Sequence, residues 1–314
     1  MSSISFIPIL KRNICRPKFS PIVLFRSKYD QNTAPAEYCA GLVRKFDYEN
    51  FICTLLLNSG IRSLAFAVRA FNIEVARVQD NVSDMKIGRM RLQFWLETID
   101  SVFKDEVRDH PVVQELHRTL QHHKSKELFK KNLRSLVTSR IEPITSSSFK
   151  TLEDMERYSE SSVSPVHYMI LQGAGISNVH ADHAASHLGK AQGLMNLVRS
   201  LPHSTKTRVV PLPQELLIKH GLSQEKVIRG QGGDNLREVV FDVASRAKQH
   251  LEKARSMKKK CPSGSAAIFL PSICLDSYLS KLQLSEFDVL DSRLQKRSAV
   301  LPLKLYWNKL LARF

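Results

Sequence analysis

The chain has little glycine, few cysteines and no long apolar run. Only 12 of its 314 residues are glycine, which favours helices over a turn-rich β architecture. The five cysteines are odd in number, widely spaced and without a CxxC pair, so a disulfide framework and a cysteine-rich zinc site are both disfavoured. No window of about 18 uninterrupted apolar residues occurs, so the sequence predicts no transmembrane helix.

Acidic residues are also few relative to basic ones. The chain has 30 Asp and Glu and 47 Lys and Arg, which gives a net charge of +17. A basic surface attracts nucleic acid, anionic lipid or acidic protein. Residues 1–30 contain one acid, Asp30, and six cations: Lys11, Arg12, Arg16, Lys18, Arg26 and Lys28. This serine-containing, acid-poor composition is typical of a mitochondrial transit peptide. We therefore predict that residues 1–35 are a transit peptide, with a disordered basic leader as the alternative.

The rest of the chain has the apolar periodicity of helices. Apolar residues recur at steps of three and four, and Pro111 is placed to open a further helix. The predicted helices cover 37–58, 61–80, 88–104, 125–140, 149–160, 182–200 and 234–257. Strand signals are scarce and no loop has the length of a linker. We predict one all-α domain over residues 36–314, which is long enough to bury a substantial core.

Motifs for phosphate or metal binding are weak. The glycine-rich pieces at 173–175 and 230–233 lack the spacing of phosphate-binding loops and are better explained as helix-boundary turns. His180, His183 and His187 would share one face of a helix, but no Cys or Glu nearby completes a zinc site. Packing and capping roles are therefore favoured for these histidines.

Asp80 and Asp84 form a DxxxD pair whose carboxylates would lie one turn apart on a helix. Two such pairs on facing helices could hold Mg²⁺ against a diphosphate, but one pair does not make that site. We expect these carboxylates to be exposed at a helix end. The basic residues lack interleaved stacking aromatics and any nucleic-acid motif, so we predict no nucleic-acid binding.

The C-terminal residues combine apolar side chains with cations. Lys304, Lys309 and Arg313 alternate with nine apolar residues: Val300, Leu301, Leu303, Leu305, Tyr306, Trp307, Leu310, Leu311 and Phe314. Such a segment suits a membrane interface. A helix docked on the core is the favoured alternative, because apolar periodicity more often marks a core-facing helix.

Three stretches, 38–78, 87–100 and 187–223, resemble the squalene/phytoene synthase superfamily. Seven residues fall where that family has the same residue: Gly189, Asn196, Arg199, Arg208, Leu212, Pro213 and Gly221. The resemblance implies an all-α, isoprenoid-synthase-like helical bundle with a central cavity. In that family Mg²⁺, held by two aspartate-rich motifs, neutralises the leaving diphosphate while two prenyl diphosphates condense head to head.

Both aspartate-rich motifs are degenerate in this chain. The aspartates of the first map onto Asn72 and Ala76, with Glu74 between them on another face of the helix. Those of the second, which follows Asn196 and Arg199, map onto two serines: Ser200 and Ser204. Amide and hydroxyl oxygens coordinate Mg²⁺ weakly, so the resemblance implies a pseudoenzyme with no catalytic residue, metal or cofactor. The alternative is an active or ligand-binding prenyl diphosphate transferase with displaced metal ligands, drawn from Asp80, Asp84 and Glu74.

A retained fold, lost metal ligands and a mitochondrial leader together resemble one mitochondrial branch of the superfamily. The resemblance is strongest in 72–100, 179–199, 221–255 and 301–310. It implies a matrix-side factor, associated with the inner membrane, that acts early in the assembly of respiratory complex I (NADH:ubiquinone oxidoreductase). Its partners would be complex I subunits or other assembly factors. A lipid- or prenyl-binding protein without chemistry is a third reading.

Overall fold

The computed structural model of this chain describes residues 34–82, 84–121, 123, 125–141 and 149–314. The regular structure of these residues is helical. Ala34–Phe314 form one compact unit, and residues 1–33 of the predicted leader lie outside the described part. Within the described residues no strand occurs, and the only β-bridge pairs Phe149 with Pro213. The all-α prediction is confirmed.

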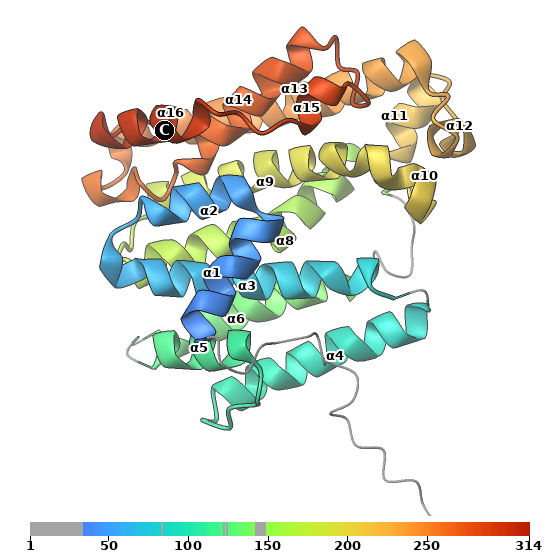
Figure 1. Cartoon of the computed structure of the whole chain (residues 1–314). Coiled ribbons are helices and arrows are strands. Elements are labelled where there is room, and N and C mark those ends of the chain that lie inside the picture. Colours follow the sequence, from blue (N-terminus) through green and yellow to red (C-terminus); the bar gives the residue numbers. More distant parts are fainter. Residues whose placement is uncertain (1–33, 83, 122, 124, 142–148) are drawn as a thin grey trace, which may run out of the picture. The chain divides into compact units, whose positions relative to one another are not determined.

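In the first half of the unit, the described residues before the long helix α8 form a series of helices (Figure 1). They are α1 (Pro35–Phe46), α2 (Tyr48–Leu55), α3 (Ser59–Asp80), α4 (Met85–Val102), α5 (Pro111–Leu120) and α6 (Lys126–Thr138). The predicted helix over 37–58 is divided at Asp47, whose non-helical backbone ends α1 and precedes α2. Pro111 opens α5 as predicted.

The second half is built on three long helices joined by short ones. The long ones are α8 (Leu152–Gly173), α9 (Val179–Ser200) and α13 (Gly233–Ser256). The short ones are η2 (Leu201–His203), α10 (Ser204–Thr207), α11 (Gln214–Lys219), α12 (Gln224–Ile228), η3 (Lys258–Lys260) and η4 (Ser263–Ser265). The chain ends with α14 (Pro271–Leu284), α15 (Ser292–Gln295) and α16 (Leu301–Leu310).

Helix α8 is much longer than the predicted 149–160, because it continues through Pro165. Proline lacks the N–H that would bond the carbonyl of Ser161 four residues earlier. The Ser135 hydroxyl donates to that carbonyl instead, at 3.2 Å. A neighbouring helix therefore replaces the missing hydrogen bond, which allows α8 to run on.

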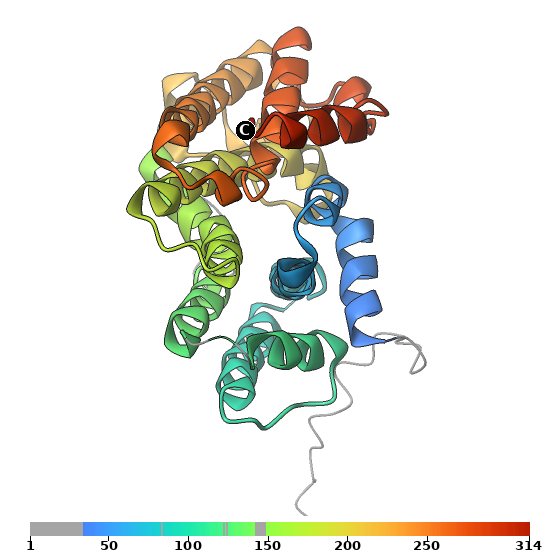
Figure 2. The same cartoon turned by 90° about the vertical axis from the view of Figure 1, so that its left-hand side faces the viewer.

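The core lies around α3, α8 and α9. Helix α3 packs against α1, α5 and α8, while α9 packs between α8 and α13. Figure 2 looks nearly along α3, with α1 on one side and α8 on the other. Helices α8 and α9 approach closely because Gly189 faces Ser164 and Gly193 faces Ser159 without a side chain between them. This arrangement places the first degenerate motif on the central helix α3, whereas the second begins at the end of α9.

A second, smaller apolar cluster fixes the C-terminus. It joins α2, α14 and α16 through Ile52, Cys53, Leu270, Ile273, Cys274, Leu301 and Leu305. The C-terminal helix is thus docked on the rest of the unit, as the favoured interpretation of its sequence predicts. No described helix has both the length and the apolarity that a bilayer crossing needs.

Candidate functional site

The first degenerate motif lies on α3, where the Asn72 side chain accepts a hydrogen bond from a buried arginine. Arg140, two residues beyond the end of α6, donates to the Asn72 side-chain oxygen at 2.8 Å. The same guanidinium also donates to the carbonyls of Leu136 and Ser162. Arg140 is 9% exposed, and arginine stays protonated in proteins. A fixed cation therefore occupies the surroundings of the residue that replaces the first aspartate.

The other two positions of this motif provide no metal site. The half-buried Glu74 faces α1 and accepts a hydrogen bond from the Tyr38 hydroxyl at 3.3 Å. Burial raises the pKa of the Glu74 carboxyl, and the charge of Arg77 partly offsets this rise. Ala76 has no donor atom. Because Asn72 faces Arg140 whereas Glu74 faces α1, the two side chains do not converge on one point.

The second degenerate motif begins at the end of α9. Asn196 is exposed, and the Ser200 hydroxyl donates to the Leu197 carbonyl of its own helix at 2.7 Å. After Ser200 the chain tightens into the 3₁₀ turn η2, as the proline at position 202 predicts. Ser204 opens the following short helix with its side chain buried.

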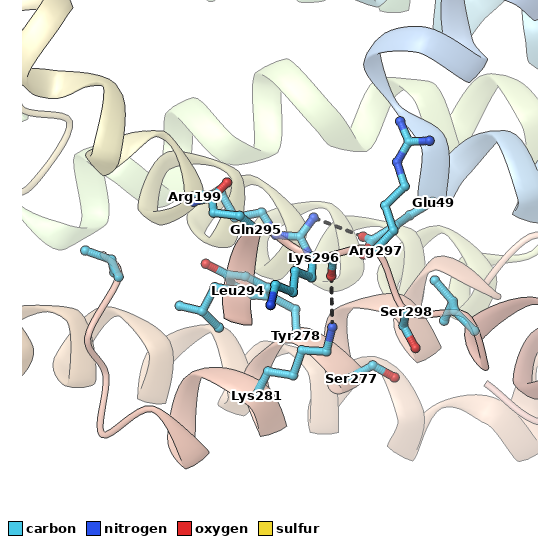
Figure 3. Close-up of a pocket in the computed structure, with 12 residues that line it drawn as sticks. Glu49, Arg199, Ser277, Tyr278, Lys281, Leu294, Gln295, Lys296, Arg297 and Ser298 are labelled. Carbon is cyan, nitrogen blue, oxygen red and sulfur yellow. Dashed lines mark hydrogen bonds and ion pairs between the residues drawn. The ribbon is translucent and has the colours of Figure 1, made fainter. Parts of the chain in front are cut away.

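Arg199 in this motif joins three helices (Figure 3). Its guanidinium forms an ion pair with Glu49 of α2 at 2.9 Å and lies over the ring of Tyr278 of α14, 4.0 Å from the ring centre. A pocket of about 180 Å³ adjoins this bridge, and Lys281 of α14 crosses it to the carbonyl of Lys296 at 3.3 Å. The family resemblance singled out Arg199, but no motif marked Glu49 or Tyr278 as its partners.

The interior between the two motifs contains a further arginine. Arg69 of α3 is 6% exposed, and burial lowers its pKa while the charge of Asp47 raises it. On α8 the imidazole of His167 is fully buried and bonds Gln192 of α9 at 3.0 Å. Burial, together with the nearby charge of Arg69, lowers the pKa of His167 to about 3. This histidine is therefore neutral near pH 7.

These contacts disfavour a Mg²⁺ ion at the motif positions. Carboxylates would attract Mg²⁺, whereas the guanidinium groups of Arg69, Arg140 and Arg199 repel it. A pocket that includes Asn196 and Arg199, between α2, α9 and α14, measures only about 10 Å³. That volume does not hold a prenyl chain.

The candidate displaced carboxylates are not assembled into a site. Asp80 is the last residue of α3, and Asp84 caps α4 by accepting from the backbone N–H of Lys86 at 2.7 Å. Both are exposed, and the chain turns between them, so they do not share a helix face. Across the described ranges, no three His, Cys, Asp or Glu side chains come together as a metal site would require.

Of the three histidines on α9, one contacts neighbouring helices and two are exposed. His187 lies 2.8 Å from His250 of α13, ring nitrogen to ring nitrogen, and His250 lies 3.2 Å from Glu156 of α8. His180 and His183 are exposed in the first turns of α9. The structure thus brings together one of the three histidines with partners that are distant in the sequence.

Solved structures share this helical arrangement. A dehydrosqualene synthase, solved in complex with a ligand, superposes with a TM-score of 0.73 at 17% identity and covers 88% of this chain and 95% of its own. Squalene synthase HpnC from Alicyclobacillus acidocaldarius superposes with a TM-score of 0.67 at 16% identity, over 81% of this chain and 94% of its own. At this identity the likeness shows the fold alone.

Residues 43–300 match the squalene/phytoene synthase family, and the chain belongs to that family. It is also similar to proteins named NADH dehydrogenase (ubiquinone) complex I, assembly factor 6. The human protein is 40% identical over 275 residues, which cover 87% of this chain and 82% of the relative. The Drosophila melanogaster homolog is 41% identical over 292 residues, with coverage of 91% and 86%. The predicted resemblance is confirmed.

Proposed function

We propose that this chain is an assembly factor for respiratory complex I and that it acts at an early stage. The observation that carries the proposal is the similarity to assembly factor 6 proteins at about 40% identity over most of both chains. Its partners in this role are complex I subunits or other assembly factors. No nucleic acid takes part.

We further propose that the chain is a pseudoenzyme. The absence of carboxylates at Asn72, Ala76, Ser200 and Ser204 supports this, because an ionising diphosphate needs its negative charge neutralised. The position of Arg140 against Asn72 adds to the argument, since a fixed guanidinium opposes a metal ion there. The synthase fold then serves as a scaffold whose surfaces bind partners.

The proposed location is the matrix side of the mitochondrial inner membrane. The basic, acid-poor composition of residues 1–35 supports import through a transit peptide. The unit that follows supports peripheral attachment, because it keeps most of the chain's net charge of +17: residues 1–35 contain only six of the 47 Lys and Arg. A positively charged protein is attracted to anionic lipid.

Complementation tests the assembly role. Cells that lack their own assembly factor 6 receive the full chain, and complex I is measured on native gels and by its NADH dehydrogenase activity. We expect recovery with the original sequence and equally with the double variant Asp80→Ala/Asp84→Ala. Failure of the original chain, when it is present in mitochondria, contradicts the assembly role.

Ligand binding tests the pseudoenzyme proposal separately. The purified chain is titrated by calorimetry with a non-hydrolysable farnesyl diphosphate analogue, with and without Mg²⁺. We expect no Mg²⁺-dependent heat. Tight Mg²⁺-dependent binding that disappears in a folded Asp80→Ala/Asp84→Ala protein would support the transferase alternative instead.

A further inference from the structure

The C-terminal helix α16 is docked along one side only. Leu301 and Leu305 are 5% and 0% exposed. The opposite side carries six large apolar side chains that are 42–72% exposed: Val300, Leu303, Tyr306, Trp307, Leu310 and Leu311. At 3.6 residues per turn these six cover an arc of roughly 140° that points away from the docked residues. We call these six residues the α16 face.

The α16 face is the densest exposed apolar cluster in the described part of the chain. Its six members fall within twelve consecutive residues, 300–311, whereas the start of α4 exposes only Met85, Ile87 and Met90. A contiguous exposed apolar surface of this kind marks an interaction site.

The charge around this face has one sign. Asp291 is the last acidic residue of the chain, and the 23 residues after it contain six Lys and Arg and no Asp or Glu. On the helix, Lys304 lies at one edge of the α16 face, where its ammonium group donates to the Ser277 hydroxyl of α14 at 2.9 Å, and Lys309 lies beyond the other edge. Long lysine stems can lie along apolar surface while their ammonium groups reach outward to anions. The surroundings therefore complement a negatively charged partner.

The residue types favour lipid over protein as that partner. Tyr306 and Trp307 are adjacent and 54% and 63% exposed, and these two side chains concentrate at the headgroup level of bilayers. Lysine is depleted in the contact regions of protein interfaces but common beside the apolar face of helices that lie in a membrane surface. A ten-residue helix is about 15 Å long, too short for a bilayer core of about 30 Å.

We propose that the α16 face is the surface by which this protein attaches to an anionic bilayer, with α16 lying in the plane of the membrane. The inference rests on the membrane association in the proposed function and names the residues responsible. The apolar side chains insert among the acyl chains, Tyr306 and Trp307 lie at the headgroups, and Lys304 and Lys309 meet lipid phosphates.

The chain has two tryptophans, which provide a direct readout. Trp95 is fully buried, whereas Trp307 is exposed on the α16 face. We expect vesicles of equal parts phosphatidylcholine and phosphatidylglycerol to shift the tryptophan emission of the full chain to the blue. Bromine-labelled lipid should quench the shifted emission. Trp307→Phe should abolish both changes while vesicle binding remains, because the phenyl ring keeps most of the apolar surface.

Two double variants test the face by vesicle flotation. Leu303→Asn/Leu310→Asn should weaken binding about hundredfold, since burying each leucine contributes roughly tenfold. The matched control Met90→Asn/Ile218→Asn changes two side chains that are 68% and 79% exposed and should bind as the original does. Ile218 lies on α11, at the opposite end of the upper layer from α16 in Figure 1.

The charge requirement has its own test. Lys304→Ala/Lys309→Ala should weaken binding to the anionic vesicles about fivefold for each lysine, and raised salt should reduce that difference. Equal binding to vesicles of phosphatidylcholine alone would contradict the anionic requirement.

Two outcomes would overturn the proposal as a whole. One is an unchanged Trp307 emission in the presence of vesicles. The other is a self-associating protein that Leu303→Asn/Leu310→Asn renders monomeric without altering vesicle binding, which would assign the α16 face to a second copy. Because these measurements use only purified protein and lipid, their failure leaves the assembly role intact. Failure of the original chain to restore complex I, while it still binds vesicles, would count against that role instead.

Discussion

The close packing of α8 on α9 leads to a measurable consequence at Gly193. A Cβ atom added there would lie 2.7 Å from the Cα of Ser159, and closer still to its Cβ. The contact is with backbone, which cannot rotate away as a flexible side chain can. We therefore expect Gly193→Ala to force the two helices apart.

The expected size follows from two opposing effects. Replacing glycine by alanine inside a helix favours folding by about 1 kcal/mol. Overpacking a tight contact costs about 1–3 kcal/mol, and contact with backbone places Gly193 at the upper end. The net result is a loss of about 2 kcal/mol in the free energy of unfolding. Gly41 of α1 provides the matched control, because a Cβ there meets nothing within 4 Å and only the favourable effect remains.

Urea unfolding of the two purified variants and the original protein, followed by circular dichroism, measures both effects. Gly41→Ala should raise the free energy of unfolding by about 1 kcal/mol and Gly193→Ala should lower it. If Gly193→Ala stabilises the protein as much as Gly41→Ala does, the α8–α9 contact is not as close as described and the reasoning is refuted.

Two further predictions concern buried polar groups. Arg140→Met removes the donor to the Asn72 oxygen and one donor to each of the Leu136 and Ser162 carbonyls. It should lower the free energy of unfolding by about 2–3 kcal/mol; unchanged urea unfolding would contradict this. Burial lowers the pKa of His167 to about 3 and that of His110 to about 4. The unfolded chain, with a histidine pKa near 6.5, therefore binds these protons first as pH falls. The contribution of each neutral, buried histidine to the free energy of unfolding should be fully present above about pH 6.5. Below that pH the free energy of unfolding should fall by up to about 1.4 kcal/mol per pH unit for each histidine. His167→Gln should flatten this decline in unfolding measured across pH, whereas His183→Gln, at an exposed position, should leave it unchanged.

The apolar periodicity predicted most of the helices but not all of their ends. The pattern over 37–58 continues across Asp47, so nothing in it signals the break between α1 and α2. Helix α8 was predicted too short because several of its buried residues are polar, including Ser159, Ser162 and His167. Periodicity identifies a helix by its apolar stripe, and a helix surrounded by others on several sides has no such stripe.

In the candidate site, too, the sequence predicts the residues of the motifs but not their partners. The residues that replace the motif aspartates, such as Asn72 and Ser200, are visible in the sequence through the family resemblance. The partners that now surround them are not visible, because Arg140 is 68 residues from Asn72 and Glu49 is 150 residues from Arg199. Interactions over such separations depend on how helices cross, which no local spacing encodes.

The sequence by itself determined the helical class and the family, and it predicted the loss of the metal-binding carboxylates, because these depend on residue identity and local spacing. Only the tertiary structure decided which side chains surround the motif positions and which side of α16 remains uncovered. Packing brings Arg140 to Asn72 of α3 and pairs Arg199 of α9 with Glu49 of α2. The sequence left both a docked helix and a membrane interface open for the C-terminus. The fold shows α16 docked through Leu301 and Leu305 with its opposite face exposed, because burial depends on which helices lie beside it.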